Sequence, residues 1–82
     1  MDKQKDITAL LADAAVRIGE NPDDPGGYVE RGKIYYRMQD WGNALNDIMK
    51  ALELDPSSGE ARTYEKMIND ILDYRYKDYY NP

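Results

Sequence analysis

Pairs of similar residues stand 34 positions apart in this sequence, and that spacing restricts the possible fold more than any other feature. The pairs are Leu11 with Leu45, Asp13 with Asp47, Ile18 with Leu52, and Pro22 with Pro56. A fixed period of about 20 to 50 residues is typical of stacked repeats, in which each unit covers the apolar face of its neighbour. The spacing therefore predicts a repeat architecture.

Apolar residues recur at three- and four-residue intervals between proline and glycine breaks, and this periodicity predicts helices. The predicted helices cover about residues 6–19, 26–39, 41–54 and 58–76 of a single domain, 1–82. Asp6 suits the start of the first helix and Gly19 its end, and Ser57 or Ser58 suits the start of the fourth. The expected fold is all-α, with about four helices in antiparallel hairpins that stack as a short α-solenoid.

One segment, residues 25–58, resembles a repeat of the tetratricopeptide (TPR) family over its whole length. The matching positions are Tyr28, Gly32, Tyr35, Ala44, Ile48 and Ala51, followed by Ala-Leu-Glu-Leu-Asp-Pro at 51–56. Gly32 and Ala44 lack bulk, so the two helices they belong to can approach closely. The sequence departs from the family pattern at Tyr28, where tryptophan is usual, at Arg31, where leucine is frequent, and at Ile48, where a larger aromatic is usual.

The flanking segments match the same family in part. Residues 6–22 resemble the second helix of a preceding repeat, without its first helix. Residues from Gly59 onward resemble a following first helix, but Arg62, Lys66 and Asn69 replace the aromatic, glycine and tyrosine. These polar residues suit a cap that faces solvent. The resemblance thus implies about one and a half repeats plus a capping helix.

Composition excludes several classes of function. The net charge of −5 disfavours binding to nucleic acid and to anionic membranes. The chain has neither cysteine nor histidine, so it lacks thiolate and imidazole ligands and the usual general base. We expect no enzyme activity, no cofactor and no metal; a calcium loop is also disfavoured, because the loops lack the alternating acidic ligands. No targeting signal or membrane span is visible, which makes a cytoplasmic location the default.

The family resemblance implies a concave surface formed by the first helix of each hairpin, where such repeats bind extended peptides. The residues expected on it are Val29, Lys33, Tyr36 and Arg37 of the second helix and Thr63, Met67 and Asp70 of the fourth. Lys33 and Arg37 lie one turn apart, so an acidic peptide or a C-terminal carboxylate is the complementary partner. The family's carboxylate clamp needs lysine at Val29 and asparagine at Lys33, so that specialised function is not carried over.

Other interpretations of these features stay open. Lys33 and Arg37 also fit an ordinary solvated helix face. The first helix lacks its hairpin mate, so either the fourth helix folds back over it or a second chain does, which makes a homodimer the alternative function. Tyrosines close to the C-terminus extend the apolar stripe of the fourth helix or form an interface; they are Tyr74, Tyr76, Tyr79 and Tyr80.

Overall fold

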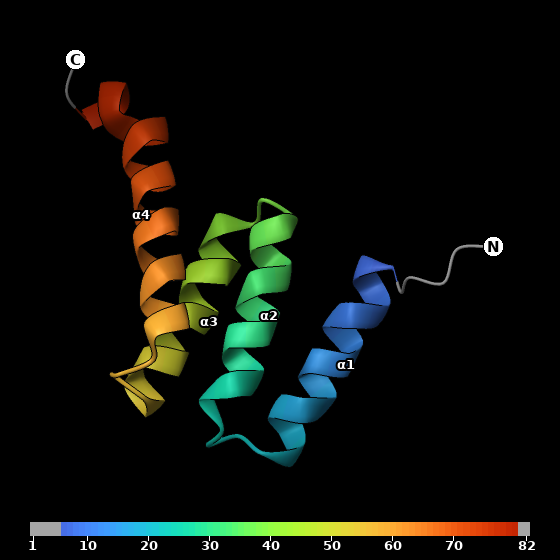
Figure 1. Ribbon diagram of the computed structural model, residues 1–82. Helices are drawn as coiled ribbons and strands as arrows, with labels where there is room; N and C mark the ends of the chain where they lie inside the picture. Colours follow the sequence, from blue (N-terminus) through green and yellow to red (C-terminus); the bar gives the residue numbers. More distant parts are fainter. Residues whose placement is uncertain (1–5, 81–82) are drawn as a thin grey trace.

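The computed structural model describes residues 6–80, with side chains described for residues 6–74. Four α-helices make up this part of the chain, and no strand occurs in it. They are α1 (Ile7–Glu20), α2 (Pro25–Arg37), α3 (Trp41–Leu54) and α4 (Gly59–Tyr80). Figure 1 shows them side by side in chain order, with α1 and α4 at opposite ends of the row. The predicted all-α fold of about four helices is confirmed.

Side-chain caps set the start of each helix. The Asp6 carboxylate accepts a hydrogen bond from the Ala9 N–H at 2.8 Å, and the Asp24 carboxylate accepts one from the Gly26 N–H at 2.9 Å. Asp40 caps α3 in the same way, and the Ser58 hydroxyl accepts from the Ala61 N–H at 3.2 Å. Each cap satisfies a backbone donor that has no partner inside its helix. Asp6 and Ser58 are therefore confirmed as helix starts.

The helix ends correct three sequence predictions. Gly19 lies inside α1, which ends at Glu20 with Asn21 as its cap. The second helix ends at Arg37 instead of residue 39, because Gln39 takes a left-handed conformation with φ of 61°. The Gln39 and Asp40 N–H groups then bond the carbonyls of Tyr36 and Tyr35, which closes the helix with a Schellman motif. The fourth helix continues beyond residue 76, to Tyr80.

The core lies mainly between α2, α3 and α4 and consists of small and aliphatic side chains. Its buried residues are Val29, Ala44, Ile48, Ala51, Leu52, Ala61 and Ile68. Gly32 allows the close approach of α2 and α3, since a Cβ atom placed there would lie 2.9 Å from Ile48 Cδ1. The predicted close contact at Gly32 is thus confirmed.

A largely buried ion pair joins the same two helices. Arg31 donates two hydrogen bonds to the Asp47 carboxylate, of 2.7 and 2.8 Å, and the Asp47 side chain is 7% exposed. The bond to Asp47 raises the pKa of the Arg31 guanidinium above its ordinary value, against the opposing effect of burial. Arg31, a departure from the family pattern, therefore provides a paired charge within the α2–α3 interface.

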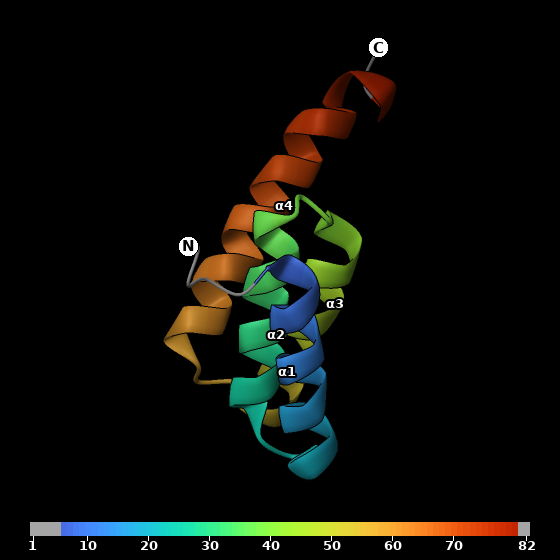
Figure 2. The same cartoon turned by 90° about the vertical axis from the view of Figure 1, so that its right-hand side faces the viewer.

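The helix α1 packs against α2 alone among the described helices. Figures 1 and 2 show α4 on the far side of α2 and α3, so α4 does not fold back over α1, and that alternative is wrong. Part of the surface of α1 stays open: Ala14 is its buried residue, and the Val16 side chain is 58% exposed. Tyr74 is 83% exposed, and the side chains of Tyr76, Tyr79 and Tyr80 lie outside the described residues.

The 34-residue spacing of the sequence recurs in the structure. The helices α1 and α3 are offset by 34 residues at both ends, and α2 and α4 are offset by 34 residues at their starts. The turns that precede α2 and α4 share one hydrogen bond, from Asp24 N to Asn21 O and from Ser58 N to Asp55 O. The pair α1–α2 is therefore a structural counterpart of the pair α3–α4.

Candidate binding surface

Two hollows lie along α2, and Lys33 lines both of them. One lies between α1 and α2, and the other also reaches the start of α4. The first, which we call the α1–α2 groove, has a volume of about 330 Å³. It is lined by Leu10, Asp13, Glu30, Lys33, Ile34 and Arg37. Leu10 and Ile34 supply apolar surface, and charges of both signs surround them. The α1–α2 groove can therefore accept an apolar side chain with charged neighbours.

The second hollow lies where α2 and α4 begin, and it has a volume of about 360 Å³. It is lined by Arg17, Pro25, Gly26, Val29, Glu30, Lys33, Asp55, Ser58 and Glu60. Glu30 and Lys33 belong to both hollows, so the two form one continuous depression along α2. The lining of this second part is mostly polar.

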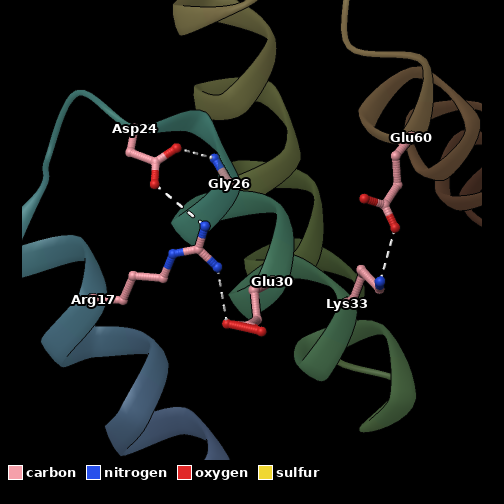
Figure 3. A network of polar contacts seen from close by, with 6 residues as sticks. All are labelled: Arg17, Asp24, Gly26, Glu30, Lys33 and Glu60. Atoms are coloured by element: carbon pink, nitrogen blue, oxygen red, sulfur yellow. Dashed lines mark hydrogen bonds and ion pairs between the residues drawn. The ribbon is translucent and has the colours of Figure 1, made fainter.

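A network of ion pairs crosses this depression (Figure 3). Arg17 of α1 contacts Asp24 Oδ2 and Glu30 Oε2, both at 3.3 Å, and so ties α1 to the start of α2. Lys33 Nζ lies 2.8 Å from Glu60 Oε2 and ties α2 to α4. The side chains of Lys33 and Glu60 are 42% and 54% exposed, so water screens this pair, and exposed pairs of this kind contribute about 0–1 kcal/mol. Lys33 can exchange Glu60 for another carboxylate at little cost.

The pKa shifts follow these contacts. The hydrogen bond from the Gly26 N–H lowers the pKa of Asp24, and the contact with Arg17 lowers it further, while desolvation acts in the opposite direction. The hydrogen bond to Asp24 raises the pKa of Arg17, and the bond to Glu60 raises the pKa of Lys33. Each shift favours the charged form near neutral pH. The depression therefore carries fixed charges.

The structure gives the sequence-predicted residues of α2 different surroundings. Lys33 and Arg37 both line the α1–α2 groove. Val29 lines the second hollow, although it is only 6% exposed and belongs to the core. The Tyr36 ring meets Trp41 and Tyr64 edge to face, with ring centroids 5.2 and 5.3 Å apart, so this half-buried tyrosine packs α2 against α3 and α4.

The predicted residues of α4 lie outside both hollows. The Thr63 hydroxyl donates to the Gly59 carbonyl at 3.0 Å. Asp70 pairs with Lys66 of the same helix at 2.9 Å, and Met67 is half-buried. Exposed pairs one turn apart are common on helix surfaces. The structure thus gathers Lys33 and Arg37 at the depression but not Thr63, Met67 and Asp70.

Sequence reasoning missed the residues that α1 contributes to the groove. Leu10 belongs to the apolar periodicity of the first predicted helix, and Asp13 to the pairs spaced 34 residues apart, but neither pattern predicts a groove. That repetition was the available signal, because Asp47 takes part in a helix–helix contact. The pairing of Lys33 with Glu60 had no signal in the sequence, since the two residues come together only through packing of α2 beside α4.

Protein-family models, curated proteins and solved structures were compared with the chain, and none of them matches. Within residues 6–74, no group of three or more acidic side chains is placed to hold a metal ion. In the described part of the chain, no helix combines the length and the apolar character needed to cross a membrane.

Proposed function

We propose that this chain is a TPR-like, non-catalytic interaction module that binds a segment of another protein along α2, next to Lys33 and Arg37. One observation carries the proposal: two basic side chains border a groove that also contains Leu10 and Ile34. A partner segment with an apolar side chain and a neighbouring acidic residue complements this lining. The TPR assignment is supported by residues 25–58 and by the 34-residue offset between helix pairs.

The absence of enzyme activity and of a cofactor belongs to the same proposal. The sequence has neither histidine nor cysteine. The charged side chains of the depression pair with one another at the surface, so they act as recognition groups and not as a poised acid and base. Binding of a protein segment needs only these charges and the apolar surface between them.

Charge reversal in the groove tests this function. The double variant Lys33→Glu/Arg37→Glu should lose the partners that the wild-type chain captures from its native lysate, because it places negative charge beside Glu30 and Glu60. The matched control is Lys50→Glu/Lys66→Glu, which changes the net charge equally at residues that line neither hollow. Circular dichroism must show both variants folded. Unchanged capture by the groove variant would reject the binding surface.

Self-association is the second candidate function, favoured by the open side of α1. Among the described helices, α1 packs against α2 alone, and Val16 of α1 is 58% exposed. A second copy that covers this side would form a homodimer without any other ligand. Light scattering at high micromolar concentration should then give twice the monomer mass of 9.5 kDa, and Val16→Glu should restore the monomer. A monomeric wild-type chain at that concentration would remove this candidate.

A further inference from the structure

Within residues 6–80, the pairs α3–α4 and α1–α2 differ in one respect: a third helix, α2, packs on α3 and α4, whereas no described helix packs on α1 and α2 in the corresponding position. In the first case α2 lies on both α3 and α4. It contacts α3 through Gly32 at Ile48 and through Arg31 at Asp47, and it contacts α4 through Tyr36 at Tyr64. The corresponding surface of α1 and α2 includes the α1–α2 groove, since Leu10 and Asp13 are the counterparts of Ala44 and Asp47.

From this comparison we infer that the α1–α2 groove is a receptor for an amphipathic helix of a partner protein. The helix would lie on α1 and α2 as α2 lies on α3 and α4. The inference rests on the proposed function and specifies the partner's secondary structure. A helix satisfies its own backbone hydrogen bonds and needs no donors or acceptors from the groove. This suits α1 and α2, whose backbone groups at the groove are already used within each helix.

The charges along the groove define the partner helix. On α3, Asp47 accepts two hydrogen bonds from Arg31 of α2. The counterpart of Asp47 on α1 is Asp13. The residue of the partner helix that corresponds to Arg31 should therefore be basic. Lys33 points from α2 to α4, where it meets Glu60. The counterpart of Glu60 on α2 is Gly26, beside which the Arg17 guanidinium lies. The partner residue at the Lys33 position therefore faces the start of α2, and an acidic side chain there complements Arg17.

The sizes of the side chains on α1 define the shape of the partner helix. The side of α3 that faces α2 carries a small, a large and a small side chain in turn. These are Ala44, Ile48 and Ala51, all fully buried. Their counterparts on α1 are Leu10, Ala14 and Arg17, which reverse that order. Ala14 is only 1% exposed, so the apolar surface that α1 offers in the groove is Leu10, which is bulkier than its counterpart Ala44. The partner helix is thus distinct from α2 of a second copy.

A peptide based on α2 itself tests this inference. The probe is an acetylated and amidated peptide of residues 25–38, stapled on its outward face, with Lys33→Glu. We expect it to bind the full chain in isothermal titration calorimetry. The unsubstituted α2 peptide, stapled in the same way, should bind at least about tenfold more weakly, because it places a lysine instead of a glutamate beside Arg17.

Charge exchange then tests the orientation of the bound helix. The chain variant Asp13→Lys should weaken binding of the probe about tenfold, and the further peptide change Arg31→Glu should restore it. Asp13→Asn serves as a variant with a smaller change of charge, and circular dichroism confirms that both variants fold. Restoration by the exchanged pair supports the inference, and weakening without restoration overturns the proposed orientation.

The remaining outcomes separate this inference from the proposed function. Equal binding of a variant probe in which a central residue is replaced by proline would show an extended ligand and overturn the helix, while the binding surface stands. Failure of the probe together with loss of partner capture in Lys33→Glu/Arg37→Glu would also reject only the helix. Failure of the probe with unchanged capture would reject both. A dimer that Asp13→Lys dissociates would show that a second copy occupies the groove, which overturns the choice of partner.

Discussion

Replacement of Gly32 by alanine tests the contact that holds α2 against α3. An added Cβ atom would lie 2.9 Å from Ile48 Cδ1, 3.1 Å from Ile48 Cγ1 and 3.4 Å from the Ala44 carbonyl oxygen. The first distance is well below van der Waals contact. The Ile48 side chain is fully buried and cannot swing into solvent, so either its rotamer or the spacing of the two helices must change.

The expected magnitude comes from two opposing effects. Overpacking of a filled core costs about 1–3 kcal/mol. Alanine in place of glycine inside a helix returns about 1 kcal/mol, because the unfolded chain has less backbone freedom to lose. We therefore expect Gly32→Ala to lower the free energy of unfolding by about 1 kcal/mol, which corresponds to a fall of roughly 4–8 °C in Tm for a domain of this size.

Thermal unfolding followed by circular dichroism measures this change, and Gly42→Ala is the matched control. Nothing lies within 4 Å of a Cβ atom at Gly42, so the same substitution there should raise Tm or leave it unchanged. Adding Ile48→Val removes Cδ1 and should recover part of the loss, so that the double variant is less destabilised than the sum of its parts. If Gly32→Ala raised Tm as much as the control, the close-contact argument would be refuted.

Three further predictions concern the ion pair, the turn after α2 and the cap of that helix. Asp47→Ala leaves Arg31 without a partner while its side chain is only 28% exposed, so urea unfolding should show a free energy of unfolding lower by about 2–3 kcal/mol. Adding Arg31→Leu should recover part of this stability, and no recovery would contradict the pairing. Gln39→Gly relieves the left-handed conformation at φ of 61° and should raise stability by about 1 kcal/mol, whereas a lower Tm would speak against strain there. Asp24 has its pKa lowered below the ordinary 3.8, chiefly by the Gly26 N–H, so its charge stabilises the fold above that pH and ceases to do so as the pH falls through the folded-state pKa. The stability advantage over Asp24→Asn should therefore stay constant from about pH 7 to 5 and shrink below about pH 4, and a difference that grows in acid would contradict this sign.

The binding surface shows where prediction from the sequence reaches its limit. Helix periodicity placed Lys33 and Arg37 together, because residues one turn apart always share a helix face. It could not show that Val29 is buried, since the burial of a residue on a helix depends on which neighbours pack there. The pairing of Lys33 with Glu60 likewise depends on how α2 and α4 lie beside each other, and no local rule relates residues 27 positions apart.

The helices, the caps at Asp6 and Ser58 and the 34-residue period can be predicted from the amino-acid sequence. These features depend on interactions within a few residues: the spacing of apolar side chains, the oxygen of Asp6 or Ser58 near free N–H groups, and the small size of Gly32. Three other features are seen only in the folded chain: the pairing of Arg31 with Asp47, the separation of α4 from α1, and the groove between α1 and α2. These features arise from contacts between helices, and the free energy of such contacts depends on complementary shape and charge across surfaces that lie far apart in the chain.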